Sequence, residues 1–173
     1  MKERIQDALA VLIGQPLWSS GRAADLAWFE FGGRRTVKDS RGEDHEVGDY
    51  ALHVQCAWRI RCGNRVVVGS RDLYYPPEET PDETNDRPED FNWDVQGSNR
   101  RDKHIAELFQ NETREFFVQK VEAGEAGSFT IIFDQGYALD VFPDDSLSGE
   151  YWRFFRPYRG EPHFVITGSG IQD

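Results

Sequence analysis

Long apolar runs are missing from this sequence, and no stretch approaches the roughly 20 residues that a membrane-spanning helix needs. The N-terminus is polar and charged, which is not the pattern of a signal peptide. These two features argue against a membrane partner. They predict a cytoplasmic protein.

Cysteine and positive charge are also scarce. Two cysteines in 173 residues provide no disulfide framework and are typical of a reducing compartment. The chain has 20 Lys and Arg against 31 Asp and Glu, a net charge of −11. Nucleic acids and anionic membranes bind clustered positive charge, so we expect neither as a partner. A net negative charge favours binding to a basic protein, which is the partner we expect.

The common catalytic and nucleotide-binding signatures are absent as well. The sequence contains no Walker loop, no GxGxxG after a strand, no GxSxG, no HExxH and no CxxC. We therefore predict no cofactor and no catalytic residue, and an enzyme is the less favoured class.

Helical spacing appears twice. Ile5, Ala8, Leu9 and Leu12 follow the i, i+3, i+4, i+7 pattern, which predicts an amphipathic helix within residues 1–13. A second helix is predicted from about Asp102 to Asn111, with Ile105, Leu108 and Phe109 on one side.

The rest of the chain is typical of strands. Short segments rich in aromatic and β-branched residues are bounded by Gly, Pro or Asp: LAWFEF, the stretch from Tyr50 to Tyr75, REFFVQKV, FTIIF, YALDVF, YWRFF and HFVIT. The sequence thus predicts one domain, residues 1–173, of the α+β class with β dominant. Its expected core is an antiparallel sheet of about six to eight strands, strongly curled or folded as a sandwich, with two helices.

Residues 76–94 form an acidic segment with eight acids and one arginine. The ligand order of an EF-hand loop, with glycine at the sixth place and glutamate at the twelfth, is absent. We therefore expect a solvated loop, most mobile over residues 77–90, whose end is fastened to the body by Phe91 and Trp93.

The stretch around His53 contains residue types used in metal and catalytic sites. Residues 52–61 alternate between apolar and polar, the pattern of a strand with one buried face. His53 and Cys56 then lie on opposite faces and cannot share a metal. Cys56 and Cys62 would be roughly 20 Å apart, too far for a disulfide. No metal is predicted.

Gly63 and Asn64 predict a type II′ turn that pairs residues 50–61 with 65–75. Trp58 would face Gly69, and one sheet face would carry polar side chains. This face is the predicted binding surface, and its residues are His53, Gln55, Arg59, Asp72 and Tyr74, with Trp93 covering them. Asp72 beside His53 would favour the charged imidazole. Ser70 would lie about 13 Å from His53, so a Ser-His-Asp triad is not expected.

Four short motifs carry a family resemblance: ALHVQCAWRI, GSRDLYY, FDQGYALDVF and GEYWRFF. They resemble uncharacterised small acidic bacterial domains, some of which occur beside secreted toxin systems and look like immunity proteins. The resemblance implies a strand-rich cytoplasmic bacterial protein. It assigns no catalytic residue.

Two functional hypotheses follow. The first is a non-enzymatic binding protein, such as an immunity-type inhibitor, whose acidic surface binds a basic protein. The alternative is a small-molecule-binding domain or modest enzyme that uses the sheet face around His53. The sequence does not predict the oligomeric state.

Overall fold

The computed structural model describes residues 1–39, 41–78, 89–110 and 114–172. Both predicted helices are present. The N-terminal helix α1 (Lys2–Leu9) continues into the 3-10 turn η1 (Ala10–Leu12), and the second is α2 (Arg100–Leu108). Two further 3-10 turns are η2 (Ser70–Tyr74) and η3 (Asp134–Gly136). No helix in these ranges is long and apolar enough to cross a membrane.

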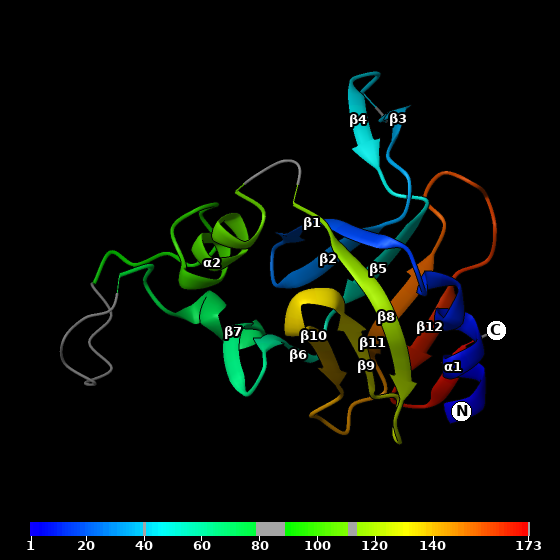
Figure 1. The fold of residues 1–173 in the computed structure, drawn as a ribbon. Coiled ribbons are helices and arrows are strands. Elements are labelled where there is room, and N and C mark those ends of the chain that lie inside the picture. Colours follow the sequence, from blue (N-terminus) through cyan, green and yellow to red (C-terminus); the bar gives the residue numbers. More distant parts are fainter. Residues whose placement is uncertain (40, 79–88, 111–113, 173) are drawn as a thin grey trace.

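The strands form one large antiparallel sheet and a separate hairpin (Figure 1). The sheet order is β13-β12-β11-β5-β2-β1-β8-β9-β10-β6-β7, and β3 pairs with β4. The strands of the chain's first part are β1 (Pro16–Ala23), β2 (Leu26–Phe31), β3 (Arg35–Lys38), β4 (Asp44–Val47), β5 (Tyr50–Val54), β6 (Ala57–Cys62) and β7 (Arg65–Gly69). Those of the second part are β8 (Phe116–Ala123), β9 (Phe129–Phe133), β10 (Tyr137–Phe142), β11 (Glu150–Phe155), β12 (Phe164–Thr167) and β13 (Gly170–Gln172).

The β-dominant α+β class and the antiparallel sheet are confirmed, but the finer prediction is wrong. The sheet has 11 strands instead of six to eight, and it is open, neither curled nor closed. The missed strands lack the usual strand composition. β1 begins at a proline and contains Ser19, Ser20 and Gly21, while half of the residues of β3 and β4 are charged.

The sheet consists of two halves that meet where β1 pairs with β8, at Pro16 opposite Phe117 and Leu17 opposite Phe116. Further along β8, the side chain of Gln6 on α1 donates to the Val121 carbonyl and accepts from the Ala123 N–H. The helix thus supplies hydrogen bonds that a neighbouring strand would make.

The core contains aromatic side chains from both halves of the sheet. Phe29 of β2 makes an edge contact with Trp58 of β6, with ring centroids 5.3 Å apart. Phe129 of β9 contacts Trp152 of β11 at 4.9 Å, and Trp152 donates its indole N–H to the carbonyl of Gly127. These rings are buried and join the halves into one core.

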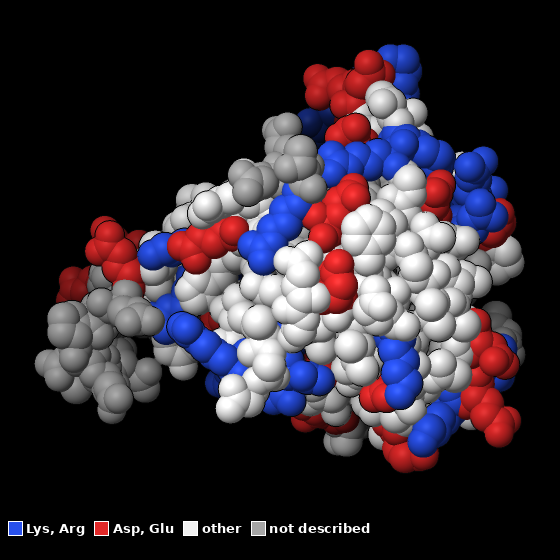
Figure 2. All heavy atoms as spheres, in the orientation of Figure 1, with Lys and Arg blue, Asp and Glu red and all other residues white. Residues whose placement is uncertain are grey.

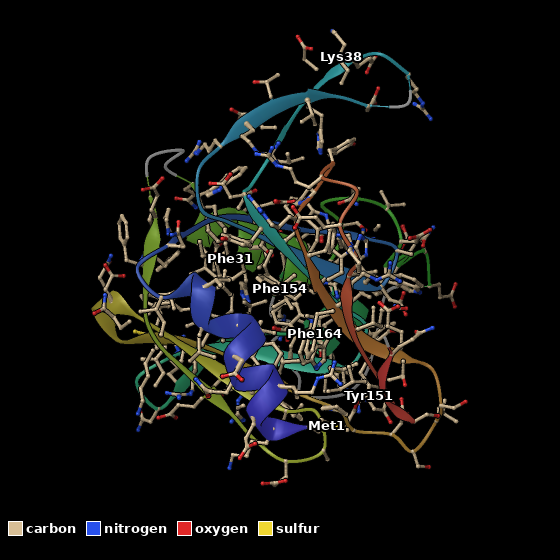
Figure 3. All side chains as sticks on the ribbon, turned by 90° about the vertical axis from the view of Figure 1, so that its right-hand side faces the viewer. Met1, Phe31, Lys38, Tyr151, Phe154 and Phe164 are labelled. Atoms are coloured by element: carbon tan, nitrogen blue, oxygen red, sulfur yellow. The ribbon has the colours of Figure 1, made fainter. Side chains whose placement is uncertain are left out.

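The β3–β4 hairpin projects from this body, and Figure 3 shows Lys38 far from Phe31, Phe154 and Phe164. Its base is held by polar contacts. Asp49 accepts the N–H of Gly33, and Arg35 donates to the carbonyl of Pro157.

The predicted continuous strand over residues 50–61 is wrong, because the chain bends at Gln55 and Cys56. Both backbone N–H groups donate to the carbonyl of Tyr151, which ends the pairing of β5 with β11. After the bend, the chain enters the other half of the sheet as β6, between β10 and β7. Both strands face the same core, so the alternation of buried residues continues through the bend and hides it.

The predicted turn at Gly63 and Asn64 is present, and Gly63 has the positive φ of 57° that a type II′ turn requires at its first central position. Cys62 pairs with Arg65, as predicted, but a bulge between Ile60 and Arg61 shifts the register. Arg59, not Trp58, therefore lies opposite Gly69. The strand then ends, and residues 70–74 form η2 instead of extending the hairpin.

Candidate functional site

The predicted binding face around His53 does not assemble. His53 lies on β5, opposite Trp28 of β2 and Arg153 of β11, whereas Asp72 lies on η2 after β7. The predicted stabilisation of the charged imidazole by Asp72 is also wrong. Burial lowers the pKa of His53, and the charge of Arg153 lowers it further.

His53 belongs instead to an aromatic cluster on β5 and β11. Its ring meets Phe155 edge-on at 4.8 Å, and Phe155 stacks on His163 at 4.2 Å. The Arg153 guanidinium is held by Glu150. These contacts account for the orientation of the ring.

The other predicted binding residues separate into three places. Tyr74 and Trp93 do lie together, with ring centroids 5.6 Å apart. Gln55 and Tyr74 line one small hollow of about 170 Å³. Arg59 is engaged elsewhere, because its Nε donates to Asp140. A binding role for each of these residues singly stays a prediction.

The Asp140 cluster holds three strands of the outer face together. Burial alone would raise the pKa of Asp140, but hydrogen bonds from Arg59, Thr130 and Arg61 outweigh it and lower the pKa. Arg59 and Asp140 thus form an ion pair with each other.

A larger hollow of about 710 Å³ lies between α2 and the β6–β7 hairpin, and we name it the α2–β7 groove. This volume is typical of small-molecule sites. Its lining comprises Arg100, His104, Glu107 and Leu108 from α2, Cys62, Arg65, Val66 and Val67 from the hairpin, and Asp72 and Tyr137. The four helix residues have i, i+4, i+7, i+8 spacing, so they form one face of α2.

Two arginines of the groove lack carboxylate partners. Within the described ranges, neither Arg65 nor Arg100 has an acidic oxygen at ion-pair distance. Arg100 lies over the ring of Tyr75, and its Nε is buried without a hydrogen-bond partner. Figure 2 shows both basic and acidic side chains on the side of the molecule where α2 and β7 lie.

His104 and Asp72 face each other in the groove. The Nδ1 of His104 is 3.9 Å from Asp72 Oδ2, and Nδ1 is buried without a hydrogen bond in the described part. Asp72 Oδ2 accepts the N–H of Gly69 at 2.9 Å, which ties η2 to the end of β7. The carboxylate therefore fixes the groove wall and faces the histidine.

The two thiols have different surroundings. Cys56 is buried, and burial raises its pKa to about 12. Cys62 is partly exposed and lines the α2–β7 groove with His104 and Asp72. A cysteine nucleophile requires a base in contact with it. No hydrogen bond between Cys62 and His104 is found among the residues described.

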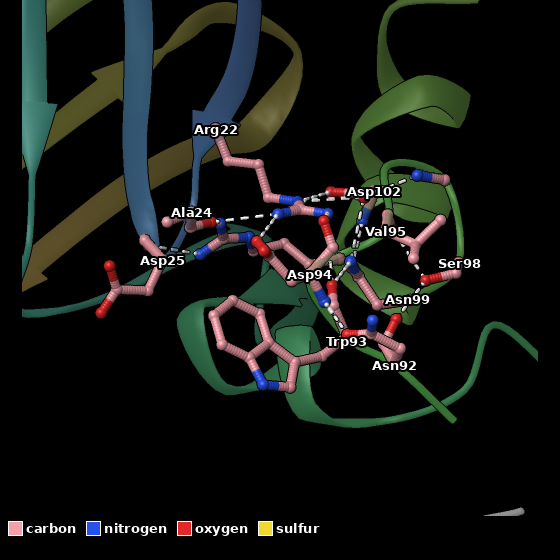
Figure 4. Close-up of polar contacts among 12 residues, drawn as sticks. Arg22, Ala24, Asp25, Asn92, Trp93, Asp94, Val95, Ser98, Asn99 and Asp102 are labelled. Carbon is pink, nitrogen blue, oxygen red and sulfur yellow. Dashed lines mark hydrogen bonds and ion pairs between the residues drawn. The ribbon is translucent and has the colours of Figure 1, made fainter. Parts of the chain in front are cut away.

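Helix α2 is positioned by a buried polar network (Figure 4). Arg22 of β1 donates through Nε to both carboxylate oxygens of Asp102, at 2.9 and 3.1 Å. The same guanidinium donates to the carbonyls of Trp93 and Asp94, and Asn99 caps the helix by accepting the N–H of Asp102. The network fixes the segment before α2, and so the helical wall of the groove.

The prediction that Trp93 fastens the end of the acidic segment agrees with these bonds. The predicted mobility of residues 77–90 falls mostly on residues 79–88, which lie outside the described residues.

No group of three or more His, Cys, Asp or Glu side chains suited to a metal is found in the described ranges. No family model, curated protein or solved structure matches the chain. The functional argument therefore rests on the geometry of this molecule.

The sequence interpretation did not find the groove. His104 is the one histidine of the predicted second helix, but Arg100 lies before the predicted start at Asp102, so a face shared by Arg100, His104 and Glu107 was not predicted. The opposite wall was missed as well, because residues 70–75 were predicted to continue a strand.

Proposed function

We propose that this protein is a non-enzymatic binding protein and that the α2–β7 groove holds a small polar ligand. The observation that carries the proposal is a hollow of about 710 Å³ lined by Arg65 and Arg100, neither of which pairs with a carboxylate in the part of the chain that the structure describes. Buried polar atoms nearly always find a partner, so the unpartnered Arg100 Nε and His104 Nδ1 favour a polar ligand or water there.

The test uses Cys62 as a reporter of occupancy. The rate at which iodoacetamide alkylates Cys62 is measured with and without a panel of thiol-free metabolites. Because the thiol lines the groove, a bound ligand should slow the reaction.

Two matched variants test whether the protection of Cys62 arises from binding in the α2–β7 groove. Val66 lines the groove and is 51% exposed, whereas Val95 lies outside its lining and is 53% exposed. Val66→Trp should fill the groove and abolish protection by the metabolite, and Val95→Trp should preserve it. Protection that persists equally in Val66→Trp, or no protection in the wild type, would refute the proposal.

A basic protein partner is the second candidate, and the net charge of −11 favours it. The test is binding of a purified basic protein encoded beside this gene, measured over a range of salt concentrations. We expect affinity to fall steeply with salt, because exposed charges are screened. An affinity independent of salt would contradict an electrostatic interface.

A further inference from the structure

We propose that the ligand of the α2–β7 groove carries an oxyanion, a phosphate or a carboxylate, and that Arg65 and Arg100 bind it. This inference rests on the proposed function and specifies the class of ligand. Guanidinium groups pair with both oxyanions through charge-assisted hydrogen bonds, often two at once.

The other arginines of this acidic protein give the first support. Many of them pair with a carboxylate within 4.0 Å: Arg22, Arg34, Arg35, Arg59, Arg61, Arg153 and Arg156. Arg65 and Arg100 line the groove without such a pair among the described residues. Arg71 and Arg101 line the hollow of about 170 Å³ in the same way, but Arg101 donates to the carbonyls of Asp25 and Ala24.

The negative groups of the groove do not neutralise these arginines. Asp72 is engaged by the N–H of Gly69 and faces His104. Glu107 is exposed and lies seven residues from Arg100, about 10 Å along the helix axis. Among the described residues, Arg100 therefore has no carboxylate within ion-pair distance in the groove.

The buried Nε of Arg100 gives the second support. An unpartnered buried N–H group is costly, and an oxyanion oxygen is a suitable acceptor for it once the side chain turns toward the groove. The guanidinium lies 5.6 Å from the centre of the Tyr75 ring, a cation–π contact that favours the charged side chain at this place.

The experiment is isothermal titration calorimetry with two probes, inorganic phosphate and succinate, at constant ionic strength. Wild-type protein should bind at least one probe. Arg65→Ala and Arg100→Ala should each weaken that binding by about tenfold or more, the loss expected for a charge-assisted hydrogen bond. Arg159→Ala removes an exposed arginine outside the groove and should leave the affinity unchanged.

The two probes identify the source of the oxyanion. Binding of phosphate alone indicates a phosphorylated ligand, and binding of succinate alone indicates a carboxylate ligand. Binding of both probes indicates an oxyanion site of broad specificity. Binding of neither probe, or equal binding by the double variant Arg65→Ala/Arg100→Ala, overturns the inference. If metabolites still protect Cys62 in that case, the proposed function stands and only the oxyanion chemistry fails.

Discussion

At the scale of single residues, Glu30 is the acidic side chain whose pKa burial raises most clearly. It lies on β2, 9% exposed, and its Oε2 accepts the N–H of Gly48 at 2.7 Å. Burial raises its pKa to about 7, although the bond from Gly48 and the charge of Arg35 both lower it. Ionisation of this buried carboxyl near neutral pH therefore destabilises the folded state.

The sign of the resulting pH dependence follows from linkage. The pKa of Glu30 is higher in the folded than in the unfolded state, so the native state holds the proton more tightly. The free energy of unfolding therefore decreases as the pH rises from about 4.5 to about 7. Glu30→Gln should remove this loss and gain up to ~3 kcal/mol relative to wild type across that window. Urea unfolding at several pH values measures it, with Glu46→Gln on the exposed β4 as the control for a lost carboxyl. A difference that does not change with pH would contradict the burial of a protonated Glu30.

The two cysteines should differ in reactivity. Cys62 lines the groove and is partly exposed, whereas the Cys56 thiol is buried with a raised pKa. We expect iodoacetamide to alkylate Cys62 in the native protein and Cys56 only after unfolding, because the thiolate is the reactive form. Peptide mapping by mass spectrometry detects each site. Native labelling of Cys56 at the rate of Cys62 would show that the bend at Gln55 and Cys56 is open to solvent.

At the scale of elements, the Arg22–Asp102 pair should hold α2 in place. The side chain of Arg22 is 1% exposed, and that of Asp102 is 13% exposed. Arg22→Ala should cost about 3–5 kcal/mol, since it leaves Asp102 without its cation in a buried site. Lys38→Ala, which breaks the exposed Lys38–Asp44 pair of the hairpin, should cost under about 1 kcal/mol.

A double-mutant cycle separates this pairing from the packing of Arg22. Arg22→Ala/Asp102→Ala should be less destabilised than the sum of the single variants, because no unpaired charge remains. Strict additivity would mean that the network in Figure 4 does not stabilise α2 through this pair.

Elements also show what the sequence could and could not predict. Both helices, the strands FTIIF and YALDVF and the Gly63–Asn64 turn follow from local patterns, and all are present. The bend at Gln55 and Cys56 is invisible locally, because β5 and β6 bury alternate residues against the same core. Its cause is the carbonyl of Tyr151, which lies about a hundred residues further along the chain.

The same limit applies to the candidate site. Arg100, His104 and Glu107 share a helix face by their spacing, which the sequence shows. Their position opposite Arg65 and Cys62 depends on η2, where Asp72 bonds to Gly69 and ends the strand. Pairing with residues 50–61 around the Gly63–Asn64 turn predicted a longer strand over 65–75, so the sequence placed Asp72 beside His53 instead.

At the scale of the whole molecule, the two halves of the sheet have different surroundings. In Figure 1, α1 lies near β12 and the C-terminus, while α2 lies beside β7 at the opposite end of the sheet order. The first helix completes hydrogen bonding along β8, and the second forms one wall of the groove. Structural and proposed binding roles are thus divided between the two helices.

The central claim is the location of the ligand site, and a two-dimensional ¹⁵N NMR titration with the metabolite panel tests it most directly. If the account is right, ligand-induced shifts of backbone amides concentrate in residues 62–67 and 100–108 and disappear in Val66→Trp. Shifts centred on His53, Arg153 and Phe155, or no localised shifts with any metabolite, would contradict it.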